Sequence, residues 1–188
     1  MYKFLFKRLI DIVASLAVLI LLSPILLIIA LIIYFQDFGP IIFKQQRVGK
    51  NGRIFLFYKF RSMPVNTPNV QSAETQKLNI TPFGKFIRRS SLDELPQLVN
   101  IIKGDMSLIG PRPPIPSQEN LVRLRKENGA LTCRPGLTGL AQINSYNFMP
   151  EEKKAEWDGK YAQSISFIND TKIVLKTFKY LCSPPPTY

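Results

Sequence analysis

An uncharged run near the start of the chain limits how the rest of it can fold. Residues 12–35 contain no charged side chain, and hydroxyls occur only at Ser15, Ser23 and Tyr34. A helix over these residues is roughly 36 Å long, which exceeds the ~30 Å hydrocarbon core of a bilayer. The run therefore predicts a membrane segment. A secretory signal peptide fits poorly, because its apolar region spans about 7–15 residues and ends at a small-residue cleavage site, and no such site follows Phe35.

Two topologies are open for this segment. One is a single spanning helix, since prolines do occur in spanning helices. The other is a helix that breaks and returns through one leaflet. Ser23-Pro24 stands at the middle of the run, where proline removes a backbone N–H and crowds the preceding turn. The halves, residues 12–22 and 25–35, are each about 16 Å long, the depth of one leaflet.

Positive charge on both flanks favours the returning topology. The positive-inside rule places such flanks on the cytoplasmic side, and a spanning helix satisfies that rule for only one flank. We therefore predict a monotopic, re-entrant helix-break-helix over residues 1–36, broken at Ser23 and Pro24. A domain on the cytosolic face then follows over residues 37–188. The flanking cations are Lys3, Lys7 and Arg8 before the run, and Lys44, Arg47, Lys50 and Arg53 after it.

The composition excludes several classes of catalytic and metal site. The 188 residues include 25 Lys+Arg, 13 Asp+Glu and no His, which gives a formal net charge of +12. Without histidine, Ser-His-Asp and Cys-His triads and HExxH zinc sites are excluded. The charge indicates an anionic partner, such as nucleic acid, phospholipid headgroups or a phosphorylated substrate. Cys133 and Cys182 form no CxxC motif, which is typical of a reducing compartment.

Prolines and glycines divide the rest of the chain into short elements. The pattern predicts an α+β domain that is mainly helical, with a β-hairpin of strands over residues 41–46 and 53–60. Helices are predicted over residues 82–89, 92–103, 117–128, 151–161 and 166–181, loops over 63–78 and 105–116, and a turn over 134–139. The last helix fits either a surface helix packed on the core or an interfacial amphipathic helix. Its apolar side carries Ile168, Leu175, Phe178 and Leu181, and its basic side carries Lys172, Lys176 and Lys179.

An acidic pair, Asp93-Glu94, stands in a strongly basic stretch of the sequence. Two capping interpretations compete with a catalytic one. Ser91 and Glu94 have the S-x-x-E spacing of a capping box, and Asp93 as N-cap with Pro96 in the first turn is the other register. In both cases the carboxylates lie at a helix N-terminus, where the helix dipole favours their anionic form.

Nearby arginines favour phosphate chemistry for this pair. Arg88 lies just upstream, and Arg112 lies in a Pro111-Arg112-Pro113 loop with a nearly rigid backbone. Guanidinium groups bind phosphate bidentately. An ionised Asp beside arginines can attack phosphorus to form an acyl phosphate, and a carboxylate pair can hold Mg²⁺ that bridges phosphate oxygens. Beside a membrane segment, these features fit phosphoryl transfer between a soluble and a lipid-borne substrate. Phosphate cradles of the GxxxxGK[ST] and GxGxxG kinds are absent.

Four motifs together resemble the bacterial sugar transferases, the small monotopic phosphoglycosyl transferases. They are YKFRSM at residues 58–63, RRSSLDELPQ at 88–97, KGDMSLIGPRP at 103–113 and RPGLTG at 134–139. The match runs in the family's order over nearly the whole chain. The resemblance implies that a UDP-sugar and undecaprenyl phosphate give an undecaprenyl-diphosphate-linked sugar and UMP, with Mg²⁺ required. It places the protein at the cytoplasmic face of the bacterial inner membrane, in contact with membrane lipid, where it starts glycan assembly.

The resemblance also implies roles for individual residues. Asp93 looks like the nucleophile that takes the phospho-sugar as a covalent intermediate. Glu94 looks like its partner, which places Mg²⁺ or handles a proton, so the two would be both catalytic and metal-binding. Ser23-Pro24 looks like the break of the family's re-entrant helix. The substrate-binding residues would be Lys59, Arg88, Pro111, Arg112, Pro113 and Gln142.

One departure from the family affects the sugar. Many relatives carry Gly-Arg after the Gln-x-Asn that follows the Pro-Gly turn, whereas QIN at residues 142–144 is followed here by SYN at 145–147. Ser and Tyr can hydrogen-bond a hydroxyl or acetamido group, so we expect an N-acetylated amino sugar. The alternative function is a membrane-anchored, non-enzymatic protein that binds anionic lipid or nucleic acid. We expect no nucleic-acid partner, because the basic residues are dispersed and no aromatic-interleaved RNA motif occurs.

Overall fold

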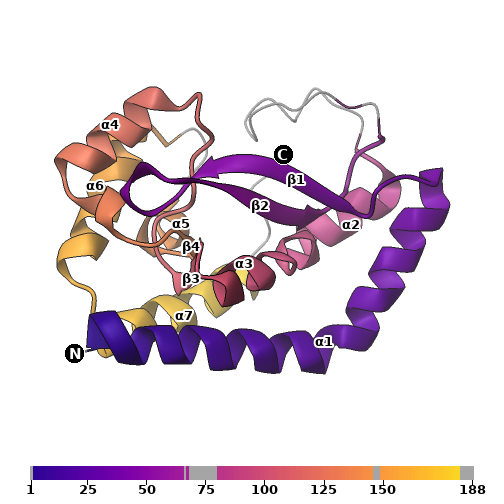
Figure 1. Ribbon diagram of the computed structural model, residues 1–188, viewed down its shortest axis with the longest axis horizontal. Coiled ribbons are helices and arrows are strands. Elements are labelled where there is room, and N and C mark those ends of the chain that lie inside the picture. The colour runs from indigo at the N-terminus through magenta and orange to yellow at the C-terminus, as the bar shows by residue number, and fades with distance from the viewer. Residues whose placement is uncertain (1, 66, 68–79, 146–148, 183–188) are drawn as a thin grey trace.

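The computed structural model describes residues 2–65, 67, 80–145 and 149–182. Over these ranges the chain is mixed α and β and mostly helical, with one long apolar helix at its start and a short hairpin (Figure 1). This mixed, mainly helical class agrees with the prediction. Most of the predicted loop over residues 63–78 lies outside the described residues.

The first helix, α1 (Lys7–Asp37), contains the whole apolar run and follows a π-helical turn, Tyr2–Phe6. It continues through Pro24 and bends within its length (Figure 1). Pro24 has no N–H for the carbonyl of Ile20, four residues earlier. The Ser23 hydroxyl donates to that carbonyl instead, at 2.8 Å. The break expected at Ser23 and Pro24 is therefore a bend in a continuous helix, because Ser23 satisfies the carbonyl that proline leaves.

One face of α1 packs on the rest of the chain and the other face is exposed. Ile29 and Ile33 are buried in a cluster with Phe60 and Ile87. On the opposite face, large apolar side chains such as Ile20 are exposed. Within the described ranges, α1 is the one helix with the length and composition to cross a membrane.

The predicted hairpin is confirmed. Strand β1 (Ile42–Val48) pairs antiparallel with β2 (Ile54–Phe60), and Val48 faces Ile54 beside the connecting turn. The turn contains Asn51 at φ 55° and Gly52 at φ 82°, the left-handed conformations that these residue types tolerate. The hairpin crosses the middle of the molecule, and α3 (Gln97–Lys103) lies between it and α1 (Figure 1).

The single helix predicted over residues 92–103 is wrong, because the structure divides it. After α2 (Pro82–Arg89), a short 3₁₀ helix, Leu92–Glu94, precedes α3. Pro96 cannot donate the backbone hydrogen bond that one continuous helix would need. Ser91, just before the 3₁₀ helix, has a left-handed φ of 56°, so the chain turns sharply between α2 and α3.

Two three-residue strands are a feature that the sequence analysis missed. β3 (Ser107–Ile109) lies in the predicted loop and β4 (Gly136–Thr138) in the predicted turn, and they pair in parallel. Glycines allow this close approach, since a Cβ on Gly136 would lie 2.1 Å from the backbone nitrogen of Gly110. The RPGLTG motif is thus partly a strand that pairs with the KGDMSLIGPRP motif.

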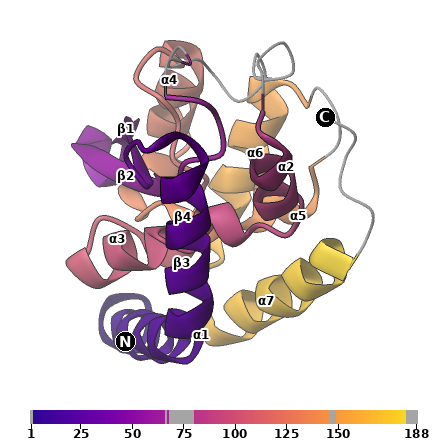
Figure 2. The same ribbon diagram turned by 90° about the vertical axis from the view of Figure 1, so that its right-hand side faces the viewer.

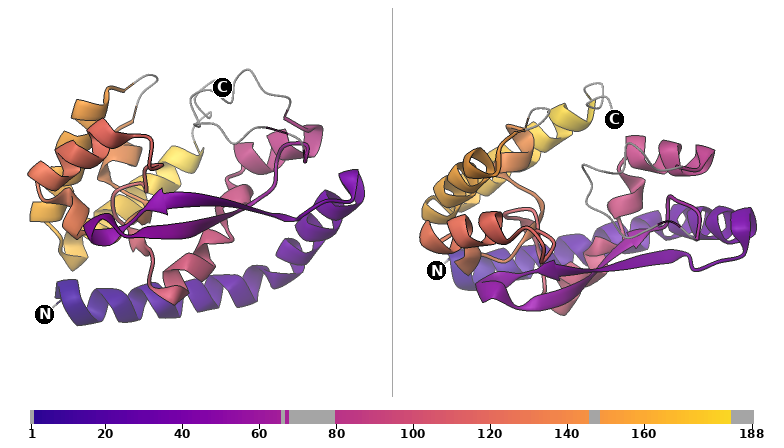
Figure 3. Two further views of the ribbon diagram at one scale, coloured as in Figure 1. Left: turned by 45° about the horizontal axis from the view of Figure 1, so that its top comes forward. Right: turned by 90° about the horizontal axis from the view of Figure 1, so that it is seen from above.

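The remaining helices cover the other end of the molecule. α4 and α6 pack together at the end away from α2 (Figure 3). α7 begins beside the first turns of α1, where Lys7 pairs with Asp170 at 2.7 Å, and then extends away from it (Figure 2). The apolar side predicted for the last helix is exposed at Ile168, Leu175 and Phe178. The bounds are α4 (Glu119–Glu127), α5 (Leu140–Ile143), α6 (Glu151–Gln163) and α7 (Phe167–Cys182).

Candidate active site

The acidic pair lies in the sharp turn between α2 and α3. Asp93 is only 5% exposed. Neither capping arrangement is present, because Ser91 makes no side-chain capping bond and α3 begins after Pro96 rather than after Asp93. The carboxylate of Glu94 instead faces cations from two other segments of the chain.

Glu94 binds Lys59 of β2 and Arg112 of the proline-rich loop. The Lys59 Nζ lies 2.7 Å from Glu94 Oε1, and Arg112 Nη2 donates to the same oxygen at 2.7 Å. Arg112 Nη1 lies 3.5 Å from Glu94 Oε2. Lys59 Nζ is also 3.7 Å from Asp93 Oδ2. We call Lys59, Asp93, Glu94 and Arg112 the carboxylate cluster.

The two neighbouring carboxylates differ in their electrostatics. Burial raises the pKa of Asp93 above its ordinary value; Lys59 opposes this shift, the charge of Glu94 adds to it, and Arg88 and Arg112 oppose it. Burial alone would also raise the pKa of Glu94, but Arg112 and Lys59 outweigh burial and hold that pKa well below its ordinary value. Among the described residues no hydrogen bond is donated to Asp93, whereas Glu94 accepts from both cations. Asp93 is therefore the carboxylate left available to a ligand.

Arg88 lies in the last turn of α2, and its Nε donates to the Ser62 hydroxyl at 2.7 Å. This bond fixes Arg88 near enough to Asp93 to contribute to its electrostatics. Ser62 is a supporting residue that the sequence analysis did not single out. No spacing in the sequence connects Ser62 with Arg88, because the bond depends on the packing of α2 against the end of β2, where Ile87 and Phe60 share one buried cluster.

The proline-rich loop is held through its backbone. Pro111 and Pro113 are buried, and their carbonyls accept hydrogen bonds from the Gly136 amide at 2.9 Å and from Arg47 Nη1 at 3.0 Å. The carbonyl of Arg112 accepts from Arg125 Nη1 at 2.8 Å. Pro111 and Pro113 therefore support Arg112.

Arg125 and Asp158 form the buried support of this loop. Arg125 is 4% exposed and Asp158 is 1% exposed, and Arg125 Nε donates to Asp158 Oδ2 at 2.9 Å. The sequence analysis missed both residues, and it named Arg47 only as a cation that flanks the apolar run. A signal existed for Arg125, because it lies four positions after the buried Leu121 on the same face of α4.

Gln142 is not joined to the carboxylate cluster by any hydrogen bond in the described part of the chain. It lies in α5, where its Nε2 donates to the carbonyl of Leu137 at 3.0 Å. Its Oε1 is buried and finds no partner among the described residues. Tyr146 and Asn147 of the divergent segment lie outside the described residues. Ser23 and Pro24 lie in α1, where they form the bend.

The described residues contain no group of three or more His, Cys, Asp or Glu side chains that could hold a metal ion. The adjacent carboxylates of Asp93 and Glu94 remain as possible oxygen donors. Mg²⁺ is commonly bound through one or two carboxylates, with waters and substrate phosphates completing its shell. The donor set thus fits an ion that binds together with a phosphate substrate.

A buried Asp93 and a partly buried Glu94 between cations on rigid supports have the chemical groups that a group-transfer site for phosphate-bearing substrates needs. The comparisons agree with this class. The sequence profile described as "Bacterial sugar transferase" matches residues 2–184, so the chain belongs to the bacterial sugar transferase family.

Two relatives named as undecaprenyl-phosphate sugar transferases are longer than this chain. It is 42% identical over 181 residues to the UDP-glucose:undecaprenyl-phosphate glucose-1-phosphate transferase of Klebsiella pneumoniae, covering 92% of this chain and 39% of that protein. It is 40% identical over 190 residues to the undecaprenyl-phosphate galactose phosphotransferase of Salmonella typhimurium, covering 92% of this chain and 40% of that protein. It also covers 85% of the uncharacterized sugar transferase EpsL of Bacillus subtilis, with 38% identity and 92% of this chain matched. The chain thus spans about two fifths of the first two relatives.

The cations around Glu94 should make stability depend on pH in acid. Because Arg112 and Lys59 lower the pKa of Glu94 from its ordinary 4.5, this carboxylate stays ionised in the folded chain at a pH where the unfolded chain binds a proton. Its stabilisation is present above about pH 4.5 and is lost as the pH falls toward the folded-state pKa. We expect the difference in unfolding free energy between wild type and Glu94→Gln to shrink between about pH 6 and about pH 3.

Denaturant unfolding in detergent measures this difference. Glu127→Gln is the matched control, since Glu127 is exposed on α4 and, among the described residues, forms an ion pair with Arg123 alone. A wild-type advantage over Glu94→Gln that stayed constant across the range would contradict the prediction.

Proposed function

We propose that the chain transfers a sugar-1-phosphate from a UDP-sugar to undecaprenyl phosphate, releases UMP and so starts membrane glycan assembly. The observation that carries this proposal is Asp93, a buried carboxylate that accepts no hydrogen bond from the described residues while Lys59 lies 3.7 Å away. The names of two relatives support the substrate classes, because both include undecaprenyl phosphate and one includes a UDP-sugar.

The reaction proceeds in two displacements at phosphorus. A carboxylate oxygen of Asp93 attacks the sugar-linked phosphorus of the UDP-sugar, and the bond from that phosphorus to the bridging oxygen breaks, so UMP leaves with the electron pair. The intermediate is an aspartyl phospho-sugar. An oxygen of undecaprenyl phosphate then attacks the same phosphorus and expels the Asp93 carboxylate, which regenerates the enzyme.

The surrounding cations orient the phosphates and balance their charge. Arg112 and Lys59 are already fixed by Glu94, and Arg88 is fixed by Ser62, so little side-chain ordering remains when a diphosphate binds. Glu94 acts mainly as the positioning residue for the two cations. Since its hydrogen bonds keep it ionised, it is poorly suited to donate a proton.

Mg²⁺ is part of the proposal. Asp93 and Glu94 are the residues that would hold it, and the ion would supply positive charge to the phosphate oxygens as charge develops on the leaving UMP. The hydrogen bonds from Lys59 and Arg112 to Glu94 keep one carboxylate in place for this purpose.

The proposed location is the cytoplasmic face of the bacterial inner membrane. The exposed apolar face of α1 and the exposed apolar residues of α7 give the chain two surfaces for lipid contact. The bend in α1 supports a re-entrant course, because a helix that turns within its apolar run can bring both basic flanks to one side. An oxygen of the lipid-borne acceptor phosphate would then reach the phospho-sugar on Asp93 near the headgroup layer.

Asp93→Asn tests the nucleophile. The amide is nearly the same size but a far weaker nucleophile, so we expect a loss of UMP release of at least about 10³-fold with the protein still folded and membrane-bound. With labelled UDP-sugar and no acceptor, wild type should become labelled with the phospho-sugar and Asp93→Asn should not. Glu127→Gln, which removes a distant exposed charge, should keep wild-type turnover. Full turnover by Asp93→Asn would show that another group attacks the phosphorus.

A panel of UDP-sugars with polyprenyl phosphate tests the sugar. Ser145 and its neighbours replace the Gly-Arg of many relatives, so we expect UMP release to be fastest with an N-acetylated amino sugar, by about tenfold over the plain hexoses. The measurement is UMP release at equal substrate concentrations. A preference for UDP-glucose or UDP-galactose would reject the amino-sugar assignment and leave the reaction class intact.

Side-specific labelling tests the re-entrant course of α1. Single cysteines replace Lys3 or Arg53 in a chain whose two native cysteines are changed to serine, and intact inverted vesicles are treated with an impermeant maleimide. We expect both positions to react from the cytoplasmic side, because both basic flanks remain there. Labelling of the two positions from opposite sides would establish a spanning helix.

A further inference from the structure

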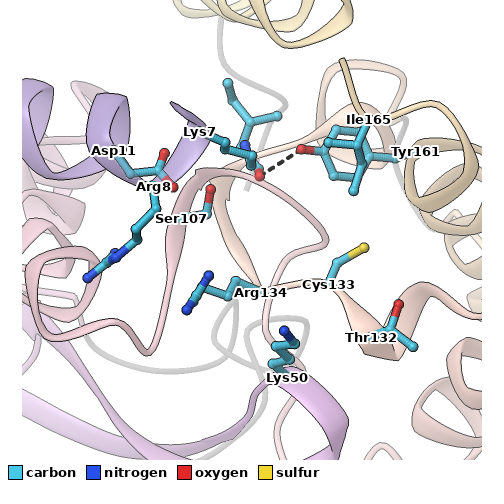
Figure 4. Close-up of a pocket in the computed structure, with 11 residues that line it drawn as sticks. Lys7, Arg8, Asp11, Lys50, Ser107, Thr132, Cys133, Arg134, Tyr161 and Ile165 are labelled. Atoms are coloured by element: carbon cyan, nitrogen blue, oxygen red, sulfur yellow. Dashed lines mark hydrogen bonds between the residues drawn. The ribbon is translucent and has the colours of Figure 1, made fainter. Parts of the chain in front are cut away.

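A second basic site lies at the far end of α3 from the carboxylate cluster. Asp93 and Glu94 precede the first residue of α3, whereas this pocket lies beside its last turn and the first turns of α1 (Figure 4). Its volume is about 190 Å³. None of the residues that line it belongs to the carboxylate cluster.

Four cations line the pocket and only one acid does. The acid, Asp11, accepts a hydrogen bond from the backbone N–H of Leu108 at 3.0 Å. Lys7 is paired with Asp170, which lies outside the lining. Positive charge therefore exceeds negative charge even when this outside partner is counted. The four cations are Lys7, Arg8, Lys50 and Arg134.

Arg8 and Arg134 are anchored side by side on the carbonyl end of α3. Arg8 donates to the carbonyls of Ile101 at 2.6 Å and Ile102 at 2.9 Å, and Arg134 Nε donates to the carbonyl of Gly104 at 3.0 Å. Burial, and then repulsion from Arg134, lowers the pKa of Arg8, while Asp11 opposes the shift. The two terminal nitrogens of Arg134 have no acceptor within the described ranges, so they remain available in the pocket.

Ser107 supplies an independent sign of a missing partner. Its side chain is 1% exposed and lines the pocket, and its hydroxyl has no hydrogen-bond partner among the described residues. A buried hydroxyl without a partner is costly and uncommon in native proteins. Figure 4 shows Ser107 between Arg8 and Arg134, on the pocket side of β3.

We propose that this pocket binds a phosphate group, either as the free dianion or as the phosphate of an anionic lipid headgroup. Arg134 Nη1 and Nη2, Lys50 Nζ and the Ser107 hydroxyl are the donors, and they come from three separate segments of the chain. Such convergence suits a tetrahedral oxyanion, because a planar carboxylate is satisfied by one guanidinium fork. The volume exceeds the ~150 Å³ of a cavity that accepts benzene, so a phosphate and a small substituent fit. Exposed Leu9 and Ile10 on the adjoining turn of α1 make a headgroup an accessible source.

The experiment is a calorimetric titration of the full chain in neutral detergent, with inorganic phosphate and with phosphatidylglycerol as two separate probes. Saturable binding is expected. Lys50→Gln and Ser107→Ala should each weaken it by at least about fivefold, the effect of losing one hydrogen bond to a charged group. Ser107→Ala removes no hydrogen bond from the described structure, so it tests the site even if Arg134→Gln fails to fold. Saturation by phosphate identifies a soluble anion, and saturation by phosphatidylglycerol alone identifies the lipid.

Two controls distinguish binding in this pocket from nonspecific electrostatic binding and from binding at the carboxylate cluster. Arg123→Gln removes an exposed cation of α4, which pairs with Glu127, and should leave binding unchanged. Arg112→Gln removes a cation of the carboxylate cluster, and binding sensitive to Lys50 and Ser107 should persist in that background. The proposal is overturned if neither probe binds saturably, or if Arg123→Gln lowers affinity as much as Lys50→Gln and Ser107→Ala do.

Discussion

The carboxylate of Glu94, bound at once by Lys59 and Arg112, is the contact on which the candidate site depends. It joins β2, the turn before α3 and the proline-rich loop, three segments that do not pair with one another through a common sheet. The Lys59 Nζ also lies 5.6 Å from the ring centroid of the buried Phe57, and the Arg47 guanidinium lies 5.1 Å from the same ring. A single aromatic ring thus contacts one cation of the cluster and one cation that supports the loop.

The support for this contact extends through α3 to the long apolar helix α1. Asn100 is fully buried, and its side-chain amide donates to the carbonyl of Leu56 at 2.7 Å and accepts from the N–H of Tyr58 at 3.1 Å. These bonds fix α3 against β2 beside Lys59. At the other end of α3, Arg8 of α1 binds the last carbonyls. The turn with Asp93 and the first turns of α1 are therefore attached to the same short helix, so the position of α1 also sets the position of the site.

Local patterns predicted the elements, and non-local contacts explain what those patterns missed. The uncharged run, the glycine turn and the Pro-Gly boundaries predicted α1, the hairpin and most helices, because each signal lies within a few residues of its effect. The β3–β4 pair was missed because its strands have three residues each, too few to show alternation. Arg125, Asp158 and Ser62 were missed because their partners are 13 to 33 positions away in sequence. In the carboxylate cluster, Asp93, Glu94 and Arg112 came from an acidic pair and an arginine in a basic stretch of the sequence, and Lys59 came from the resemblance to a family. The structure brings all four together.

The pKa values of the two adjacent carboxylates shift in opposite directions, and this difference gives the clearest division of roles in the site. Asp93 and Glu94 occupy one 3₁₀ turn, so their place along the backbone does not explain why their pKa values shift in opposite directions. The difference arises because the Glu94 side chain points toward hydrogen-bond donors of the described residues and the Asp93 side chain does not. Glu94 accepts charge-assisted hydrogen bonds from Lys59 and Arg112 that stabilise its ionised form. Asp93 is buried with no hydrogen bond from the described residues, which leaves its anion poorly solvated. A poorly solvated carboxylate retains its nucleophilicity and gains most when a cation-bound phosphorus accepts its electrons. In the proposed reaction, the same burial that makes Asp93 costly to ionise would therefore suit it to attack, while the ion pairs that hold Glu94 would suit it to keep the cations in place.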